Sequence, residues 1–220
     1  MKHALQAALF FVAAGLFAQE TQTALIRDLA GTVEVKAPRA AGWTAAYKGQ
    51  TLTADTVIST GFKSTAVIAI GNSILTVRPL TRLSITELSR IQDNEKVELR
   101  LQTGRVRADV KPLQGGRTDF TVRSSAATAS VRGTTFEFDT LNLSVSEGTV
   151  EFRGASGAPV LVDAGRISAA AADGAVSPPA EIFALQPELP PGTDALPATA
   201  GETVVPQAGN STELSVSIYF

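Results

Sequence analysis

Short runs in which apolar and polar residues alternate recur along most of the chain. Alternation with period two places successive side chains on opposite faces, as a half-buried β-strand requires. Gly, Asn, Pro or Ser stands in nearly every gap, as expected for turns between strands. The pattern predicts an all-β domain, a compact roll or sandwich of many short strands, and also allows a solenoid-like stacking. The runs lie at 29–35, 56–59, 66–70, 74–77, 83–88, 97–101, 106–110, 120–122, 136–138, 141–145, 150–152 and 160–162.

One local pattern occurs three times, around Gly31, Gly104 and Gly148. In each case an apolar residue is followed by a glycine turn and then by a valine that begins the next strand. The spacings between the three glycines are unequal, whereas a repeat array keeps a fixed period. We therefore interpret the three segments as one kind of turn used three times.

The first residues have the composition of a secretory signal peptide. Lys2 supplies the positive start, and an apolar run at 4–18 follows, interrupted by Gln6 and Gly15. The run is shorter than the ~20 residues that span a bilayer. We predict a signal peptide at 1–18 with cleavage after Ala18, the alternative being an uncleaved anchor. The mature protein is then exported, to the periplasm or the cell exterior, with no transmembrane segment and, because cysteine is absent, no lipoprotein anchor.

The last part of the chain changes composition. Seven of the eleven prolines lie at 178–206, and no Lys or Arg occurs at 174–220. Proline removes a backbone donor, and such composition buries too little apolar surface to offset its ordering entropy. We predict an all-β domain at 24–172, a Pro-rich acidic linker at 173–211 and, since alternation returns there, a terminal strand at 212–220.

The scarcity of cysteine and histidine narrows the catalytic and metal-binding chemistry that the chain can carry. Cysteine is absent and His3 is the single histidine, so the predicted mature chain lacks Ser-His-Asp and Cys-His catalysis, disulfides and ordinary zinc ligands. The acidic residues fall on polar strand faces or in turns. The formal net charge of −2 does not favour a nucleic-acid partner. We predict a protein without enzymatic activity or cofactor.

Three further groups of residues have two interpretations each. Trp43 and Tyr47 could form a platform for sugar stacking, but packing in the core or at its rim is favoured because so few aromatic residues accompany them. The run 93–95, Asp-Asn-Glu, could bind Ca²⁺ through oxygen atoms, and a turn between strands explains it better. The run of basic residues from Arg100 to Lys111 favours a solvated sheet face over an anion site.

Two segments carry a family resemblance. Residues 131–136 read Val-Arg-Gly-Thr-Thr-Phe, and residues 145–150 read Val-Ser-Glu-Gly-Thr-Val. Together they resemble the pattern V-R-G-T-x-F … V-x-E-G-x-V of the FecR-type periplasmic domain. Further matches lie upstream at Trp43, Gly49, Leu52, Asp55, 58–60, 66–88 and 101–106, with Ala54 standing where the family prefers glycine.

The resemblance spans residues 28–155 and implies a compact, solenoid-like all-β unit that interacts with other envelope proteins. Regulators of the FecR type place a cytoplasmic segment and a transmembrane helix before this domain, and relay an outer-membrane signal to a sigma factor. We expect this chain to have neither part, so that the domain carries over and the signalling role does not.

The resemblance and the turn chemistry select eight signature residues, each with a structural role. We expect Gly133 to supply a positive φ or a close backbone approach, and Thr134 to begin a strand. Arg132 either binds turn carbonyls or Glu147 within the domain, which we favour, or contacts a carboxylate on a partner. The signature residues are Trp43, Arg132, Gly133, Thr134, Phe136, Glu147, Gly148 and Val150.

The predicted function is that of a non-catalytic, exported protein-interaction or signal-sensing module in the bacterial envelope. Its partner would be another envelope protein, bound at exposed sheet edges or loops. The alternative is a structural envelope protein that associates with carbohydrate or peptidoglycan.

Overall fold

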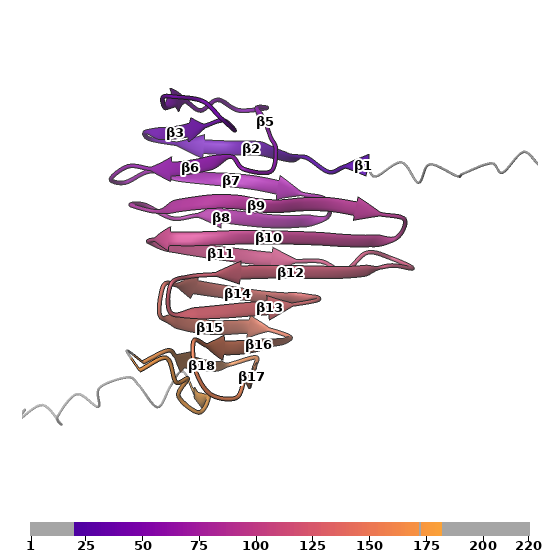
Figure 1. The fold of residues 1–220 in the computed structure, drawn as a ribbon, viewed down its shortest axis with the longest axis vertical. Coiled ribbons are helices and arrows are strands. Elements are labelled where there is room, and N and C mark those ends of the chain that lie inside the picture. The colour runs from indigo at the N-terminus through magenta and orange to yellow at the C-terminus, as the bar shows by residue number, and fades with distance from the viewer. Residues whose placement is uncertain (1–19, 172, 182–220) are drawn as a thin grey trace, which may run out of the picture. The chain divides into compact units, whose positions relative to one another are not determined.

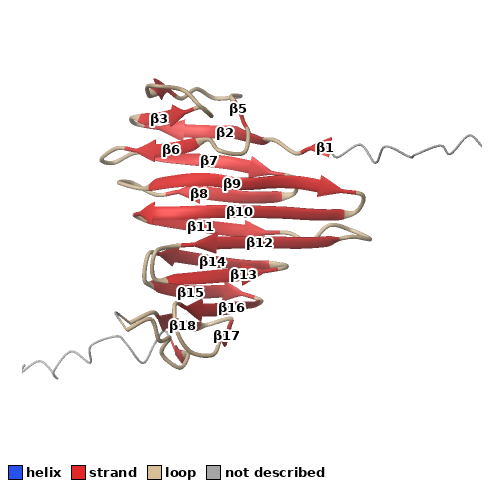
Figure 2. Ribbon diagram, in the orientation of Figure 1, coloured by secondary structure: helices blue, strands red, loops and turns tan. Residues whose placement is uncertain are grey.

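The computed structural model describes residues 20–171 and 173–181, and that part of the chain consists of strands and connecting loops without a helix (Figure 2). Alternation of buried and exposed side chains runs through most strands of four residues or more, as the sequence predicted. The strands are β1 (Glu20–Thr21), β2 (Ala24–Ala30), β3 (Val33–Lys36), β4 (Thr44–Ala45), β5 (Thr51–Leu52), β6 (Val57–Thr60), β7 (Thr65–Ile70), β8 (Ser73–Val77), β9 (Arg82–Ile91), β10 (Asn94–Thr103), β11 (Arg105–Val110), β12 (Arg117–Arg123), β13 (Ala127–Val131), β14 (Thr134–Asp139), β15 (Asn142–Glu147), β16 (Thr149–Gly154), β17 (Val160–Asp163), β18 (Arg166–Ala169) and β19 (Ala180–Glu181).

The strands form two sheets. Sheet A has ten strands in the order β17-β16-β13-β12-β10-β9-β6-β3-β4, with β1 paired to β9 beside this path. Sheet B has nine strands in the order β19-β18-β15-β14-β11-β8-β7-β2-β5. Strand order within each sheet largely follows chain order, so the colours in Figure 1 change steadily along the stack.

The chain alternates between hairpins within one sheet and crossings to the other. The hairpin β9–β10 lies in sheet A, β11 lies in sheet B, and the hairpin β12–β13 returns to sheet A. β10 and β12 therefore run parallel, in register from Asn94↔Arg117 to Arg100↔Arg123, whereas the other strand pairs of the described residues are antiparallel. The expectation of an all-β sandwich of short strands is confirmed.

One hydrophobic core fills the space between the sheets. Its largest members are Phe120, Phe136, Phe138 and Phe152, each at most 1% exposed. Phe138 of sheet B meets Phe152 of sheet A edge to face, with ring centroids 5.8 Å apart. Full burial of each such side chain contributes roughly 1.5–3 kcal/mol, so these aromatic residues hold the two sheets together.

Three of the predicted runs differ clearly from the strands that form. The run at 29–35 becomes two strands, β2 and β3, because the chain crosses from sheet B to sheet A at Gly31. The runs at 83–88 and 97–101 become the longer hairpin β9–β10, whose distal half carries polar residues beyond the apolar run. Backbone pairing extends these strands without requiring continued apolar alternation.

The paired region extends beyond the predicted boundary at residue 172. Ala170 bridges to Val176, which packs against the core, and β19 pairs with β18 at the edge of sheet B. The predicted signal peptide at 1–18, the linker from residue 182 onward and the predicted strand at 212–220 lie outside the described residues, so these boundaries stay predictions. Within 20–171 and 173–181, no helical segment has the length and apolar character needed to cross a bilayer.

Candidate functional site

The two segments that carry the signature meet at one corner of the sandwich. Arg132 and Gly133 lead from β13 in sheet A to β14 in sheet B, and Gly148 leads from β15 back to β16. Thr134 Oγ1 donates a hydrogen bond to the Thr149 carbonyl oxygen at 3.1 Å. We call residues 131–134 and 147–149 the signature corner.

Gly148 is the closest-packed residue of the signature corner. Its φ is +78°, and a Cβ placed on it would lie 2.8 Å from the Gly133 carbonyl oxygen and 3.1 Å from Thr134 Oγ1. The positive φ and the close approach both require glycine. Phe136 and Val150 are fully buried where the two strands leave the corner.

Gly133 fulfils one of its two predicted roles. It is not among the residues with positive φ, so the prediction of a left-handed conformation is wrong at this position. A Cβ on Gly133 would lie 3.0 Å from Pro112 Cδ, in the connection between β11 and β12. The close approach is therefore present, and the partner is a proline ring rather than a neighbouring strand.

Arg132 and Glu147 do not pair. The Arg132 side chain is 71% exposed, and its Nε lies 3.9 Å from Asp119 Oδ1 on the outer face of sheet A. Glu147 instead accepts a hydrogen bond from Thr135 Oγ1 at 3.3 Å. Arg132 donates no hydrogen bond to a turn carbonyl within the described residues. The favoured interpretation of an internal clamp is thus not supported by the geometry, because the arginine leaves the corner and points toward Asp119.

The same chemistry forms the two other glycine turns, as the sequence suggested. Gly31 has a φ of +74° and packs against Ser64, whose Oγ accepts a hydrogen bond from the Thr32 N–H at 2.8 Å. Gly104 has a φ of +87° and packs against Thr81, whose Oγ1 accepts from the Arg105 N–H at 2.9 Å. In all three corners a buried hydroxyl binds the backbone of the residue after the glycine.

These corners satisfy their polar groups internally. Ser64, Thr81 and Thr134 are buried, and their hydroxyl groups are used within the domain. A corner whose donors and acceptors are already paired offers little to a ligand, so its role is to join the sheets.

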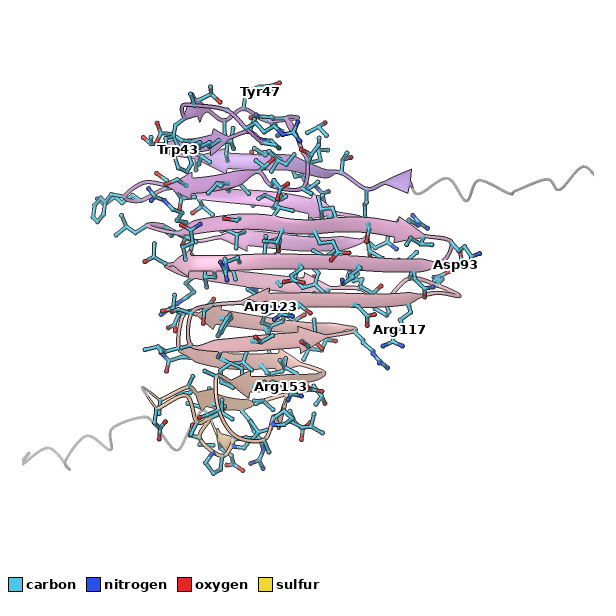
Figure 3. The ribbon with its side chains drawn as sticks, in the orientation of Figure 1. Trp43, Tyr47, Asp93, Arg117, Arg123 and Arg153 are labelled. Atoms are coloured by element: carbon cyan, nitrogen blue, oxygen red, sulfur yellow. The ribbon has the colours of Figure 1, made fainter. Side chains whose placement is uncertain are left out.

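Trp43 and Tyr47 lie at the end of the sandwich formed by the first strands (Figure 3). Trp43 is 37% exposed, and the Arg82 guanidinium lies 5.3 Å from its ring centroid. Tyr47 is exposed. Trp43 therefore packs at the rim with Arg82 over its ring, which agrees with the favoured packing role rather than with an open platform for sugars.

A charged cluster lies on the outer face of sheet B. Glu137 of β14 accepts a hydrogen bond from Arg78 at 3.2 Å and another from Arg105 at 3.1 Å. Arg105 also lies 3.7 Å from Asp139. The predicted run of basic residues is thereby divided, since Arg105 belongs to this face while Arg100 lies on sheet A.

Asp139 shapes the hairpin turn beside this cluster. Burial by itself raises the pKa of Asp139, but the N–H groups of Asn142 and Leu141, which donate at 2.7 and 2.9 Å, together with the Asn142 side chain and Arg105, outweigh burial and lower that pKa. Its carboxylate holds the turn between β14 and β15 in place.

Cavities open on both sides of the charged cluster. One, of about 640 Å³, lies between Leu80 and Leu141, and we call it the rim groove. The other, of about 520 Å³, lies between Ile167 and Pro178. Arg105 and Glu137 line both cavities.

Sequence reasoning missed several residues of this surface. Phe62, Leu80 and Leu141 are large apolar side chains exposed in turns, outside the alternating runs or at the end of one. For Phe62 and Leu80 the one local signal is a single apolar residue directly after Gly61 or Pro79, and Leu141 has no such signal in its Asp-Thr-Leu-Asn turn. Asp93 lies in a turn as interpreted, whereas Glu95 is buried in β10, where Gln22 Nε2 donates to its Oε1. No group of three acidic or other metal-ligating residues gathers in the part of the chain that the structure describes.

One segment of the chain matches a known protein family. Residues 56–151 match the family model described as FecR protein, which confirms the predicted resemblance over that segment. None of the curated proteins compared with the chain matches it.

Two crystal structures from Parabacteroides distasonis ATCC 8503, each described as a "putative anti-sigma factor", are similar to the chain at 18% and 19% sequence identity, both with a TM-score of 0.46. Each match covers 57% of this chain and 59% of the other, so the chain matches less than two thirds of the length of those proteins.

Proposed function

We propose that the protein is a non-catalytic, exported module of FecR type that binds another protein of the bacterial envelope. The match of residues 56–151 to the FecR family carries this proposal. The sequence supports the non-catalytic part, since cysteine is absent and the single histidine, His3, lies in the predicted signal peptide. The three glycine corners support it as well, because their polar groups serve the joining of the sheets.

The proposal is tested with the full-length chain, carrying a C-terminal epitope tag, in the bacterium that produces it. We expect the protein in the envelope fraction with its N-terminus at Gln19, and we expect one envelope protein to copurify after chemical crosslinking. The tag fused to an unrelated exported protein is the control. Retention on isolated peptidoglycan without a protein partner would favour the structural or carbohydrate-associated alternative. A cytoplasmic, uncleaved protein would contradict the proposal.

A further inference from the structure

Three neighbouring turns of the sandwich each expose a large apolar side chain. They are Phe62 between β6 and β7, Leu80 between β8 and β9, and Leu141 between β14 and β15, with exposed fractions of 74%, 59% and 44%. We call these three residues the apolar rim. Single exposed apolar residues are ordinary, but a contiguous group on one edge marks an interaction surface.

The members of the apolar rim are linked in space. The Leu80 N–H donates to the Gly61 carbonyl oxygen at 3.2 Å, which places the Leu80 turn beside the Phe62 turn. Leu80 and Leu141 line the same rim groove, with Gly104 between them. A Cβ on Gly104 would lie 2.7 Å from the Leu80 carbonyl oxygen, so the Leu80 turn is packed firmly against that corner. The three side chains thus belong to one continuous surface.

Two residues of the rim turns adopt the left-handed backbone region. Leu80 has a φ of +56°, and Lys63, directly after Phe62, has a φ of +53°. The Cβ of an L-residue collides with the backbone there, and asparagine or glycine would occupy these positions at lower cost. An exposed leucine recovers none of that cost by burial within the domain. Strain retained at an exposed apolar side chain points to a use outside the domain.

The charges around the rim favour an acidic partner. Lys63 follows Phe62 in the same turn, and Arg82 begins β9 on the outer face of sheet A, two residues after Leu80. Neither takes part in an ion pair among the described residues. Each lies near an aromatic ring instead, Lys63 at 5.7 Å from Phe62 and Arg82 at 5.3 Å from Trp43. Arg78 and Arg105, on the floor of the rim groove, are balanced by Glu137 and Asp139. The rim therefore has an excess of positive charge.

We propose that the apolar rim and the rim groove dock an extended segment of a partner protein in which apolar and acidic residues alternate. Its apolar side chains would enter the groove between Leu80 and Leu141, and its carboxylates would meet Lys63 beside Phe62. A groove of about 640 Å³ accommodates a few side chains rather than a folded domain. A lipid surface fits less well, because it would bury the charged floor at Glu137 against hydrocarbon. The inference rests on the proposed function, a protein-interaction module.

Site-specific photocrosslinking in the producing cell tests it. A photoreactive phenylalanine analogue replaces Phe62 or Leu141 in the full-length chain, and Leu161 or Ile91, which are exposed elsewhere, in matched controls. We expect positions 62 and 141 to crosslink to the same protein, and the crosslinked peptides identified by mass spectrometry to be acidic and apolar. Adducts with lipid, or with basic peptides, would overturn the inference. Protein adducts at 161 or 91 alone would also overturn it while leaving the proposed function intact, and no protein adduct at any of the four positions would count against both.

Two variants test how much the apolar rim contributes to partner binding. Phe62→Ser combined with Lys63→Glu should lower the amount of copurified partner at least about tenfold, corresponding to roughly 1.4 kcal/mol, with an unchanged melting curve. Leu161→Ser removes an apolar side chain of similar exposure and should leave the yield as it is. An unchanged yield with the first variant would show that the partner binds elsewhere.

Discussion

The signature corner and the apolar rim are both built from turns of the same sandwich, yet they use their residues in opposite ways. At the signature corner, Gly148 packs against the Gly133 carbonyl, and the Thr134 hydroxyl donates a hydrogen bond to the Thr149 carbonyl. At the rim, Phe62 and Leu80 face outward. The segments that carry the family pattern therefore satisfy their polar groups within the domain. The apolar side chains exposed at the rim lie in other turns of the matched segment 56–151.

Substitution of a corner glycine should have the largest effect on stability. We expect Gly148→Ala to destabilise the domain by about 2–4 kcal/mol, since the left-handed φ and the collision with the Gly133 carbonyl add together. Gly165→Ala is the matched control, because Gly165 has a φ of +77° and nothing within 4 Å of the added Cβ. It should cost about 1 kcal/mol. Urea unfolding measures both, and equal losses would mean that close packing contributes nothing to the corner.

Removal of the buried Thr134 hydroxyl at the signature corner should cause the next largest loss of stability. Thr134→Val keeps the shape of the side chain but removes the donor to the Thr149 carbonyl, which should cost about 1–2 kcal/mol. Thr44 makes the same kind of bond, from its hydroxyl to the Val35 carbonyl, in an exposed place. Thr44→Val should therefore change the free energy of unfolding by less than about 0.5 kcal/mol. If both variants melt alike, burial does not distinguish the corner from an ordinary surface turn.

Asp139 makes the stability of the rim sensitive to pH, because it holds the turn that presents Leu141. Its pKa is lowered from the ordinary value of 3.8. A lowered folded-state pKa contributes stability above the unfolded-state value, and this is lost as the pH falls through the folded-state value. We expect Asp139→Asn to be less stable than the wild type by about 1 kcal/mol at pH 7. The difference should shrink as the pH falls below 3.8, and a difference that persists at the lowest pH would show that the carboxylate charge is irrelevant.

Substitution of Leu80 should raise the free energy of unfolding, whereas the substitutions above lower it. Asparagine tolerates the left-handed region, so Leu80→Asn should stabilise the domain by about 0.5–1 kcal/mol while it weakens partner binding. Leu161→Asn is the control at an exposed position of strand β17, where φ is not positive. It should not raise the thermal midpoint. A loss of stability in Leu80→Asn would mean that Leu80 serves the fold after all.

The smallest effect is expected at Arg132. With an exposed side chain and a 3.9 Å separation from Asp119, Arg132→Ala should change the free energy of unfolding by less than about 0.5 kcal/mol. Thermal unfolding at low and high salt provides the measurement. A loss above about 1 kcal/mol would show that the Arg132 side chain makes an internal contact at the signature corner.

Much of this arrangement follows from local patterns. Alternation at 136–138 and 150–152 predicted strands and also their buried members, because period two assigns each side chain to a face. A glycine followed two residues later by a valine marked the three corners at Gly31, Gly104 and Gly148. The role of Arg132 could not be found in this way, since its nearest carboxylate, Asp119, belongs to another strand and nothing near position 132 identifies it.

Residue type and local order were enough to predict the all-β class and the three glycine turns. Those properties depend on residue type and on neighbours along the chain. The three-dimensional fold was needed to learn which sheet each strand joins, that β10 and β12 run parallel, and that the glycine corners close on Ser64, Thr81 and Thr134. It also showed that Phe62, Leu80 and Leu141 share one edge. Contacts of this kind join residues far apart in sequence, and a local pattern specifies that a strand needs a partner without specifying which one.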